Sequence, residues 1–450
     1  MTEEGNTPAE TPTARAAVDV LMEKQAEGKQ KADKYIWGLY ITLCLVSLIE
    51  SYSASSREIA FSGNIYAPML KHAALLGSGV LIVLGVQRLR FQSFIIPSII
   101  FGLATVGLLI YAMLFGETIS GANRSVPLPF GFTLFPSEMA KTGIVFILAY
   151  LLARNLRKNA ISTQGLIWCI TVVTVFGGLL LLQGMTNTIL FMGISFSMLI
   201  IGGTTGRKLM YVLLFYILIG IVFMGIKMLR DKADQAEEQM TMEQVDGAND
   251  EDNDKEGTQL RDGTWTMRIQ RWMHGITPQT PLTSKNQQEM YSRMAQANGG
   301  IFGVFPGNSK ECSRLPLAFS DYVYSIIVED TGLIGGIGLI IIYFWLLMRA
   351  GSIARKCSRA YPALLVMGMA VMVVLQAFFH MAINTGVFPV SGQPLPLISK
   401  GGTSIWMISL AFGVMLSVSR SAVQTTKRAD VNKEKEELPE SMRAANPTRE

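Results

Sequence analysis

Apolar residues run along the chain in long stretches, and polar residues gather in the short segments between them. A bilayer core about 30 Å thick is crossed by roughly 20 apolar residues of α-helix. That length predicts ten spans, at residues 36–54, 71–87, 93–114, 136–153, 163–182, 189–204, 209–228, 322–348, 361–382 and 403–419. The sixth is short, and residues 183–187 before it predict a tight turn. The pattern therefore predicts an all-α polytopic membrane protein with ten transmembrane helices.

Composition agrees with this pattern. Of 450 residues, 50% are hydrophobic and 16% are charged, whereas soluble domains carry about 25% charge. The four cysteines show no CxxC spacing, so neither a disulfide framework nor a cysteine metal site is indicated. The net charge of +5 is spread over short loops and does not indicate nucleic acid as a partner. These features exclude a soluble enzyme and a disordered polymer.

Basic residues divide unevenly between the two sets of short loops. One set holds Arg88, Arg90, Arg154, Arg157, Lys158, Arg207, Lys208, Arg349, Arg355, Lys356 and Arg359. The opposite set holds Arg57, Lys71, Arg124 and Lys400. Because cytoplasmic loops are enriched in lysine and arginine, the first set is predicted to be cytoplasmic. Ten spans then place both termini in the cytoplasm and residues 231–320 outside.

This topology divides the chain into five segments. They are a charged cytoplasmic tail (1–34), helices one to seven (35–230), an extracytoplasmic loop (231–320), helices eight to ten (321–420) and a second charged cytoplasmic tail (421–450). Within the outer loop, residues 231–256 hold eleven acids against two bases, which is typical of a solvated segment. The rest of that loop alternates Trp265, Met267, Trp272 and Met273 with Arg268 and Arg271, as a helix at a membrane surface does. It then becomes rich in glycine and turns.

Charged residues at the ends of membrane spans are candidates for function. Glu138 and Lys141 follow Pro136 at the outer end of the fourth span and share one helical face. They form either a structural salt bridge or, together with Arg124, a site where two cations hold a phosphate group. Asp321 begins the eighth span and is either a helix N-cap or a carboxylate set up as a general base.

Other polar residues lie deeper in the predicted bilayer. Glu329 and Asp330 are about 12 Å further along the eighth span and are expected to be paired structural groups. Gln376, His380 and Asn384 share one face of the ninth span and suit interhelical hydrogen bonds; the other histidines show no metal-ligand spacing. Residues 384–404 contain prolines and glycines that predict the wall of a cavity. The residues alone leave transport and catalysis both open.

Four motifs carry a resemblance: GANRSVPLPFGFTLFPSEMAK, GGIFGVFPGNS, FSDYVYSIIVEDTGLIGG and NTGVFPVSGQPLPLISKGGTSIW. In this order and topology the chain resembles the bacterial FtsW/RodA, or SEDS, family over about residues 35–420. The stretch GVFPVSGQPLPLISKGGTS and the later GVMLSVSR resemble the division branch, typified by FtsW, more than the elongation branch, typified by RodA.

The resemblance implies a peptidoglycan glycosyltransferase that polymerises lipid II on the outer face of the bacterial inner membrane, at the division septum. Asp321 matches the family's catalytic aspartate and would act as general base. Arg124, Glu138 and Lys141 match residues that would bind the substrate and its pyrophosphate. Lys400 stands where a tyrosine is common, and is either a further phosphate contact or a lysine snorkelling to the interface.

The resemblance also implies partners: a class B penicillin-binding protein transpeptidase, other divisome proteins, and the lipid II substrate. It specifies no cofactor and leaves a need for a divalent cation open. The chain departs from the family at 183–188, where an acidic residue is missing, and at Val304, where lysine is common. Alternative readings are a lipid II flippase, an elongation-type polymerase and a scaffold without catalytic activity.

Overall fold

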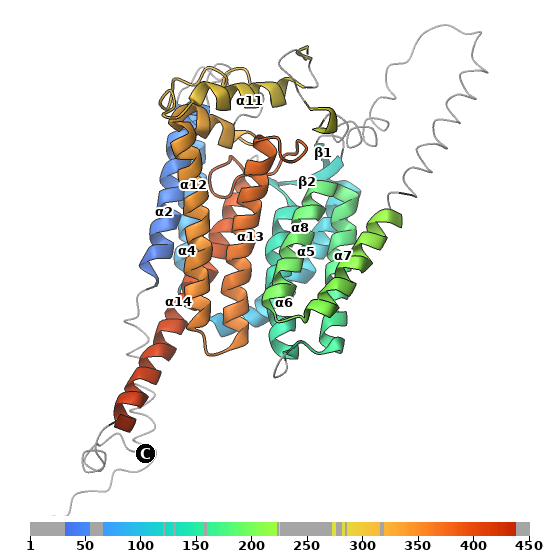
Figure 1. Cartoon of the computed structure of the whole chain (residues 1–450), viewed down its shortest axis with the longest axis vertical. Helices are drawn as coiled ribbons and strands as arrows, with labels where there is room; N and C mark the ends of the chain where they lie inside the picture. Colours follow the sequence, from blue (N-terminus) through green and yellow to red (C-terminus); the bar gives the residue numbers. More distant parts are fainter. Residues whose placement is uncertain are drawn as a thin grey trace, which may run out of the picture.

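The fold comes from a computed structural model of the chain. It describes residues 32–54, 66–119, 122–128, 132–156, 160–222, 225, 272–275, 281–283, 286–315 and 319–437. Long helices lie side by side, α11 lies across one end of the bundle, and α14 extends beyond the other end (Figure 1). Helices dominate because an apolar segment in lipid satisfies its backbone polar groups only within itself.

Eight helical segments in the described residues are long and apolar enough to cross a membrane. They are α2 (Lys34–Ala54), α4 (Tyr66–Val86), η1 (Phe91–Phe94) running into α5 (Ile95–Phe115), α6 (Pro136–Asn155), α7 (Thr163–Gln183), α12 (Val323–Arg355), α13 (Ala360–Asn384) and the first part of α14 (Gly402–Glu437). The expected short sixth span is α8 (Met185–Ile201), which Gly184 alone separates from α7. The expected seventh begins as a helix over 206–222, and its remainder lies outside the described residues.

The centre of the bundle is formed by three helices. In the apolar windows of α6, α13 and α14, 72%, 72% and 78% of the residues are buried, against 28% for α4 and α12. Helix α13 packs on α6, α8, α12 and α14, and α6 packs on α5, α7 and α8. Polar residues on α6 and α13 are therefore held in the interior of the bundle.

The structure differs from the sequence predictions in two places. The segment expected as a plain outer loop between α5 and α6 contains three short antiparallel strands, β1 (Glu117–Ile119), β2 (Ala122–Leu128) and β3 (Phe132–Leu134), in the order β1-β2-β3. In addition, α14 continues as helix to Glu437, well into the segment predicted as a charged tail. The acidic insert 231–256 and residues 265, 267, 268 and 271 lie outside the described residues.

Helix α12 is broken at Gly332, whose φ is 73°. The break frees backbone groups, and the preceding loop supplies their partners: Val304 N donates to Glu329 O (2.9 Å), Phe305 N to Asp330 O (2.8 Å) and Leu333 N to Gly300 O (3.0 Å). A side chain at Gly332 would overlap the backbone of this loop. The glycine-rich motif therefore packs against the kink as part of the bundle.

The opposite end of α12 is tied to the start of α2. Arg349 Nε donates to both carboxylate oxygens of Asp33, at 3.2 and 3.0 Å, and Nη2 donates to Oδ2. Burial raises the pKa of the Asp33 carboxyl, but the Arg349 guanidinium and the backbone N–H groups of Tyr35 and Ile36 outweigh it. The pKa of Asp33 is consequently below its ordinary value.

Candidate functional site

A buried ion pair opens α6. Pro136 occupies the first turn, where its missing N–H costs nothing, and Glu138 and Lys141 follow one turn apart. Lys141 Nζ donates to Glu138 Oε1 at 2.5 Å, and the two side chains are 1% and 7% exposed. The predicted contact between these residues is confirmed, and it lies in the interior of the bundle.

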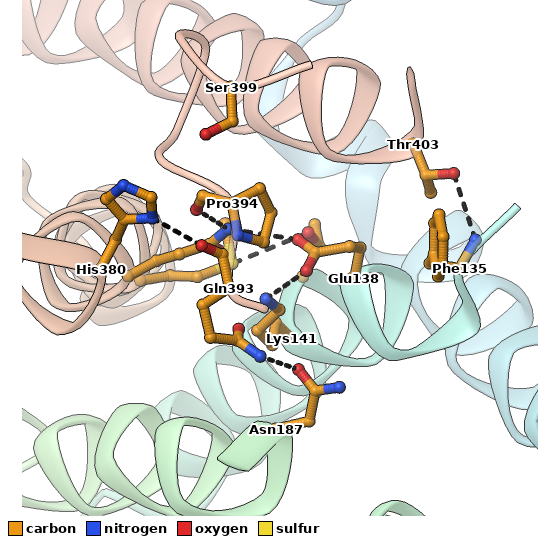
Figure 2. A network of polar contacts seen from close by, with 12 residues as sticks. Phe135, Glu138, Lys141, Asn187, His380, Gln393, Pro394, Ser399 and Thr403 are labelled. Atoms are coloured by element: carbon orange, nitrogen blue, oxygen red, sulfur yellow. Dashed lines mark hydrogen bonds and ion pairs between the residues drawn. The ribbon is translucent and has the colours of Figure 1, made fainter. Parts of the chain in front are cut away.

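The pair is connected to the loop between α13 and α14, residues 385–401. Gln376 Nε2 of α13 donates to Glu138 Oε2 at 3.3 Å and to the carbonyl of Pro394 in this loop at 3.2 Å. Figure 2 shows the loop descending beside the ion pair, with Pro394 next to Glu138. One amide thus joins α6, α13 and the loop.

One turn further along α13, His380 contacts the same loop. Its Nδ1 lies 2.6 Å from the carbonyl oxygen of Gln393, and because a carbonyl only accepts, Nδ1 carries the proton. Its Nε2 then accepts from Asn384 Nδ2 at 3.3 Å. With these partners, His380 is a neutral imidazole that carries its proton on Nδ1.

Asn384 completes the line of three predicted on one face of α13 and reaches Asp321. Its Nδ2 donates to the Asp321 carbonyl at 3.0 Å, and its Oδ1 accepts from the Ser325 N–H (3.3 Å) and hydroxyl (3.0 Å). Gln376, His380 and Asn384 therefore bond to loops as well as to helices. Gln376 and His380 bond to the neighbouring carbonyls of Pro394 and Gln393, and Asn384 bonds to His380 and to Asp321, so the three positions connect the ion pair to Asp321 by way of the loop.

Asp321 lies before α12, which begins at Val323 with Tyr322 as its N-cap and no capping side chain. The N-cap reading of Asp321 is therefore wrong. The Asp321 carboxylate accepts from the Ser320 hydroxyl at 2.7 Å, and it is partly exposed while Tyr322 and Val323 after it are buried. A carboxylate at the end of the bundle with access to solvent is able to meet a substrate.

The loop 385–401 packs against this carboxylate. A Cβ added to Gly392 would lie 2.9 Å from Asp321 Oδ2, so a larger residue there would displace the Asp321 carboxylate. Ser399 donates to the Ser320 carbonyl at 2.7 Å, and Lys400 N donates to the Phe319 carbonyl at 3.0 Å. Both sides of the loop thus hold the segment 319–321.

The same loop is fixed to two helices at its base. Ile398 O accepts from Ser47 of α2 (3.1 Å) and Pro396 O from Tyr343 of α12 (2.7 Å). Leu397, buried between them, has a φ of 64°, which costs a residue with a Cβ roughly 1–2 kcal/mol. Such strain persists only where the surroundings fix the backbone. Contacts with other parts of the protein therefore hold this irregular segment, and the cavity wall predicted for residues 384–404 stays a prediction.

Glu329 was expected to be a paired structural group, and it is hydrogen-bonded as one. It is fully buried, its Oε1 accepts from the Lys310 N–H at 3.0 Å and the Glu311 N–H at 3.4 Å, and its Oε2 accepts from the Ser309 hydroxyl. The Asn298 amide of α11 (Gln287–Gly299) also donates to Oε1, at 3.4 Å. Glu329 therefore anchors the glycine-rich loop to α12.

The structure describes the other predicted site residues to different extents. Arg124 lies in β2, but its side chain is outside the described part of the structure. Lys400 lies in the loop that packs on Asp321. Among the described residues, no group of three or more His, Cys, Asp or Glu side chains is arranged to hold a metal ion. The substrate-binding roles of Arg124, Glu138, Lys141 and Lys400 stay predictions.

Sequence reasoning missed Gln393 and Asn187. Gln393 Nε2 donates to Asn187 Oδ1 of α8 at 2.8 Å, and both lie within the network of Figure 2. Asn187 belongs to the turn where an acidic residue was noted as missing. Ser391, Gln393 and Ser399 are polar side chains in a loop already expected at membrane depth, and that was the available signal.

The fold and this network define a class: a multi-pass helical membrane protein with a buried polar network at one end of its bundle. A profile of the FtsW, RodA and SpoVE family, described as "Cell cycle protein", matches residues 33–424. The chain therefore belongs to this family.

Individual relatives agree with the family match. The chain is 27% identical over 387 residues to the probable peptidoglycan glycosyltransferase FtsW of Trichlorobacter lovleyi, which covers 85% of this chain and 91% of that one. The rod shape determining protein RodA of Thermus thermophilus matches with a TM-score of 0.57 at 20% identity, over 87% and 97% of the two chains. A chain of a peptidoglycan synthase complex matches with a TM-score of 0.61 at 20% identity, over 87% and 99%. The two structural matches establish the fold.

Proposed function

We propose that this chain is a peptidoglycan glycosyltransferase that polymerises lipid II, with Asp321 as the general base. The observation that carries the proposal is the placement of Asp321: a partly exposed carboxylate at the end of the bundle, held by the loop 385–401 and by Asn384. Membership of the family and relatives named as probable peptidoglycan glycosyltransferases support the reaction class.

In the proposed reaction, the glucosamine 4-hydroxyl of one molecule attacks the muramyl anomeric carbon of the growing chain. The new glycosidic C–O bond forms as the C–O bond to undecaprenyl pyrophosphate breaks, and the electron pair leaves with the pyrophosphate. Asp321 accepts the hydroxyl proton, as a base within hydrogen-bond reach does. Arg124 and Lys400 lie on the predicted outer side, where cations stabilise the leaving pyrophosphate.

The Glu138–Lys141 pair has a supporting role in this proposal. Both groups are buried, and through Gln376 they fix the loop that packs on Asp321. Because the Glu138 carboxylate balances the charge of Lys141, the pair adds less positive potential to the site than an unpaired lysine would. The pair therefore positions the loop that packs on Asp321.

The cellular role follows from the same relatives. Several relatives at 26–27% identity are named FtsW, so we place the chain in septal wall synthesis, at the cytoplasmic membrane with both termini inside. A chain of similar fold comes from a peptidoglycan synthase complex, which supports a class B penicillin-binding protein as the partner that crosslinks the new strands. Other divisome proteins complete the proposed assembly.

One experiment separates polymerase from flippase. The purified protein is reconstituted in vesicles with fluorescent lipid II, and glycan polymer and transbilayer movement are measured on the same sample. The proposal expects polymer, which muramidase digests back to disaccharide units. If lipid II moves across the bilayer and no polymer forms, with or without the transpeptidase partner, the protein is a flippase and not a polymerase. A protein that does neither and still supports division would be a scaffold.

A further inference from the structure

Two buried polar atoms flank the tip of the loop that packs on Asp321. Ser391 and Gln393 are 6% and 3% exposed, and Ser391 Oγ and Gln393 Oε1 have no hydrogen-bond partner among the described residues. Buried polar atoms in folded proteins nearly always have a partner, and an unmade hydrogen bond is costly. Two such atoms lie two residues apart in the loop that packs on the proposed base, which makes this part of the loop a candidate ligand site.

The backbone between them is in contact with the proposed base. Gln393 N donates to the Ser391 carbonyl at 3.0 Å, which closes a three-residue turn with Gly392 at its tip. Gly392 is exposed, and a Cβ there would lie 2.9 Å from Asp321 Oδ2. The two unpartnered atoms therefore belong to the residues on either side of the point where the loop meets the carboxylate.

The Gln393 side chain is fixed in its orientation. Its Nε2 donates to Asn187 Oδ1 at 2.8 Å, and its backbone carbonyl accepts from His380 at 2.6 Å. With the amide nitrogen engaged, Oε1 is left as an acceptor. Ser391 Oγ is both a donor and an acceptor, so the turn presents one acceptor and one hydroxyl.

A sugar hydroxyl matches this pair, because it too donates and accepts. Resting on the proposed function, we infer that Ser391 and Gln393 bind a hydroxyl of the acceptor sugar, next to the hydroxyl that gives its proton to Asp321. The turn at Gly392 sets the spacing between the sugar-binding atoms and the base. Ser391 and Gln393 thus orient the acceptor and do not take part in proton transfer.

The test measures steady-state polymerisation of lipid II by purified Ser391→Ala and Gln393→Met, together with thermal unfolding in detergent. Loss of one hydrogen bond to the acceptor raises KM about five- to tenfold, with kcat within about twofold because binding alone is weakened. Ser391→Ala does not lower the unfolding temperature, since its hydroxyl has no hydrogen-bond partner in the described part of the chain.

Two matched variants control for structure. Thr204→Val removes another buried hydroxyl oxygen that lacks a partner, after α8 and far in sequence from the loop, and leaves KM unchanged. Asn187→Ala removes the partner of Gln393 and keeps Oε1, so its KM lies closer to wild type than that of Gln393→Met. An unchanged KM in Ser391→Ala, or equal effects of Gln393→Met and Asn187→Ala, would overturn the inference.

The failure of this inference is distinguishable from failure of the general base. In an Asp321→Asn background, which does not turn over, Ser391→Ala weakens equilibrium binding of lipid II by the same factor. If Asp321→Asn polymerises normally while Ser391→Ala raises KM, the base is wrong and the sugar site stands. If Asp321→Asn is inactive and Ser391→Ala binds lipid II as tightly as its parent, the sugar site is wrong.

Discussion

Replacing Lys141 by methionine tests whether the ion pair of α6 is a buried structural element. Lys141 is 1% exposed and its ammonium lies 2.5 Å from Glu138. Lys141→Met leaves the Glu138 carboxylate in the interior, where the Gln376 amide donates to it at 3.3 Å but supplies no positive charge. Breaking one side of a buried pair costs about 3–5 kcal/mol, mainly because the remaining charge is unpaired.

The second variant in this test removes both charges. Glu138→Gln/Lys141→Met leaves no buried charge, and replacing a whole buried pair is often close to neutral, so most of the lost stability returns. Both variants are compared with wild type by thermal unfolding in detergent.

Arg293→Met is the more exposed control. Arg293 and Glu289 form an i, i+4 ion pair at 2.8 Å, and their side chains are 37% and 14% exposed, so the cost is about 0–1 kcal/mol. The reasoning is refuted if Lys141→Met unfolds like Arg293→Met, or if the double variant is no more stable than the single one.

Three further substitutions follow from the geometry. Gly392→Ala, whose Cβ would lie 2.9 Å from Asp321 Oδ2, lowers the polymerisation rate at least about tenfold with little change in unfolding temperature. Gly332→Ala, at a φ of 73°, lowers the unfolding free energy by at least about 1 kcal/mol. Asp33→Asn removes the ionic contact with Arg349. Because the pKa of Asp33 is lower in the folded protein than its ordinary value, the ionised carboxylate stabilises the fold above the ordinary carboxyl pKa. This stabilisation is lost as the pH falls through the lower folded pKa.

Each of these three predictions would be contradicted by a particular result. Full activity in Gly392→Ala would show that the loop does not set the position of the carboxylate. Wild-type stability in Gly332→Ala would contradict the close packing of the glycine-rich loop on α12. For Asp33, unfolding is followed from pH 7 down to the acid limit of folding, and a gap between wild type and Asp33→Asn that widens toward low pH would contradict the sign of the shift.

Much of the helical fold was predictable from sequence because lipid imposes a simple rule. A segment such as 163–182 is long and apolar, so it becomes a helix, observed as Thr163–Gln183. The break at Gly332 was not predictable, because its partners come from the loop 300–305 about 30 residues earlier and no local pattern marks it. The strands between α5 and α6 were missed for a similar reason, since 117–134 are paired through short, irregular segments.

In the site, too, some contacts were predictable from sequence and others were not. The Glu138–Lys141 contact followed from helical spacing, and so did the shared face of Gln376, His380 and Asn384. The hydrogen-bond partners of those side chains were not predictable, because they lie in a loop whose conformation depends on contacts with helices distant in sequence. Gln393 meets Asn187 across 206 residues of chain. The N-cap reading of Asp321 failed because α12 begins at Val323, one residue later than the span predicted from hydropathy, so that Tyr322 is the N-cap residue.

The central claim is that Asp321 accepts the proton of the attacking hydroxyl. The most direct test is the initial rate of glycan polymer formation from lipid II by purified Asp321→Asn, with lipid II binding and thermal unfolding measured on the same preparation. The account predicts a loss of at least about 100-fold in rate, with binding and unfolding temperature close to wild type. Polymerisation by Asp321→Asn at a rate near that of the wild type would contradict it.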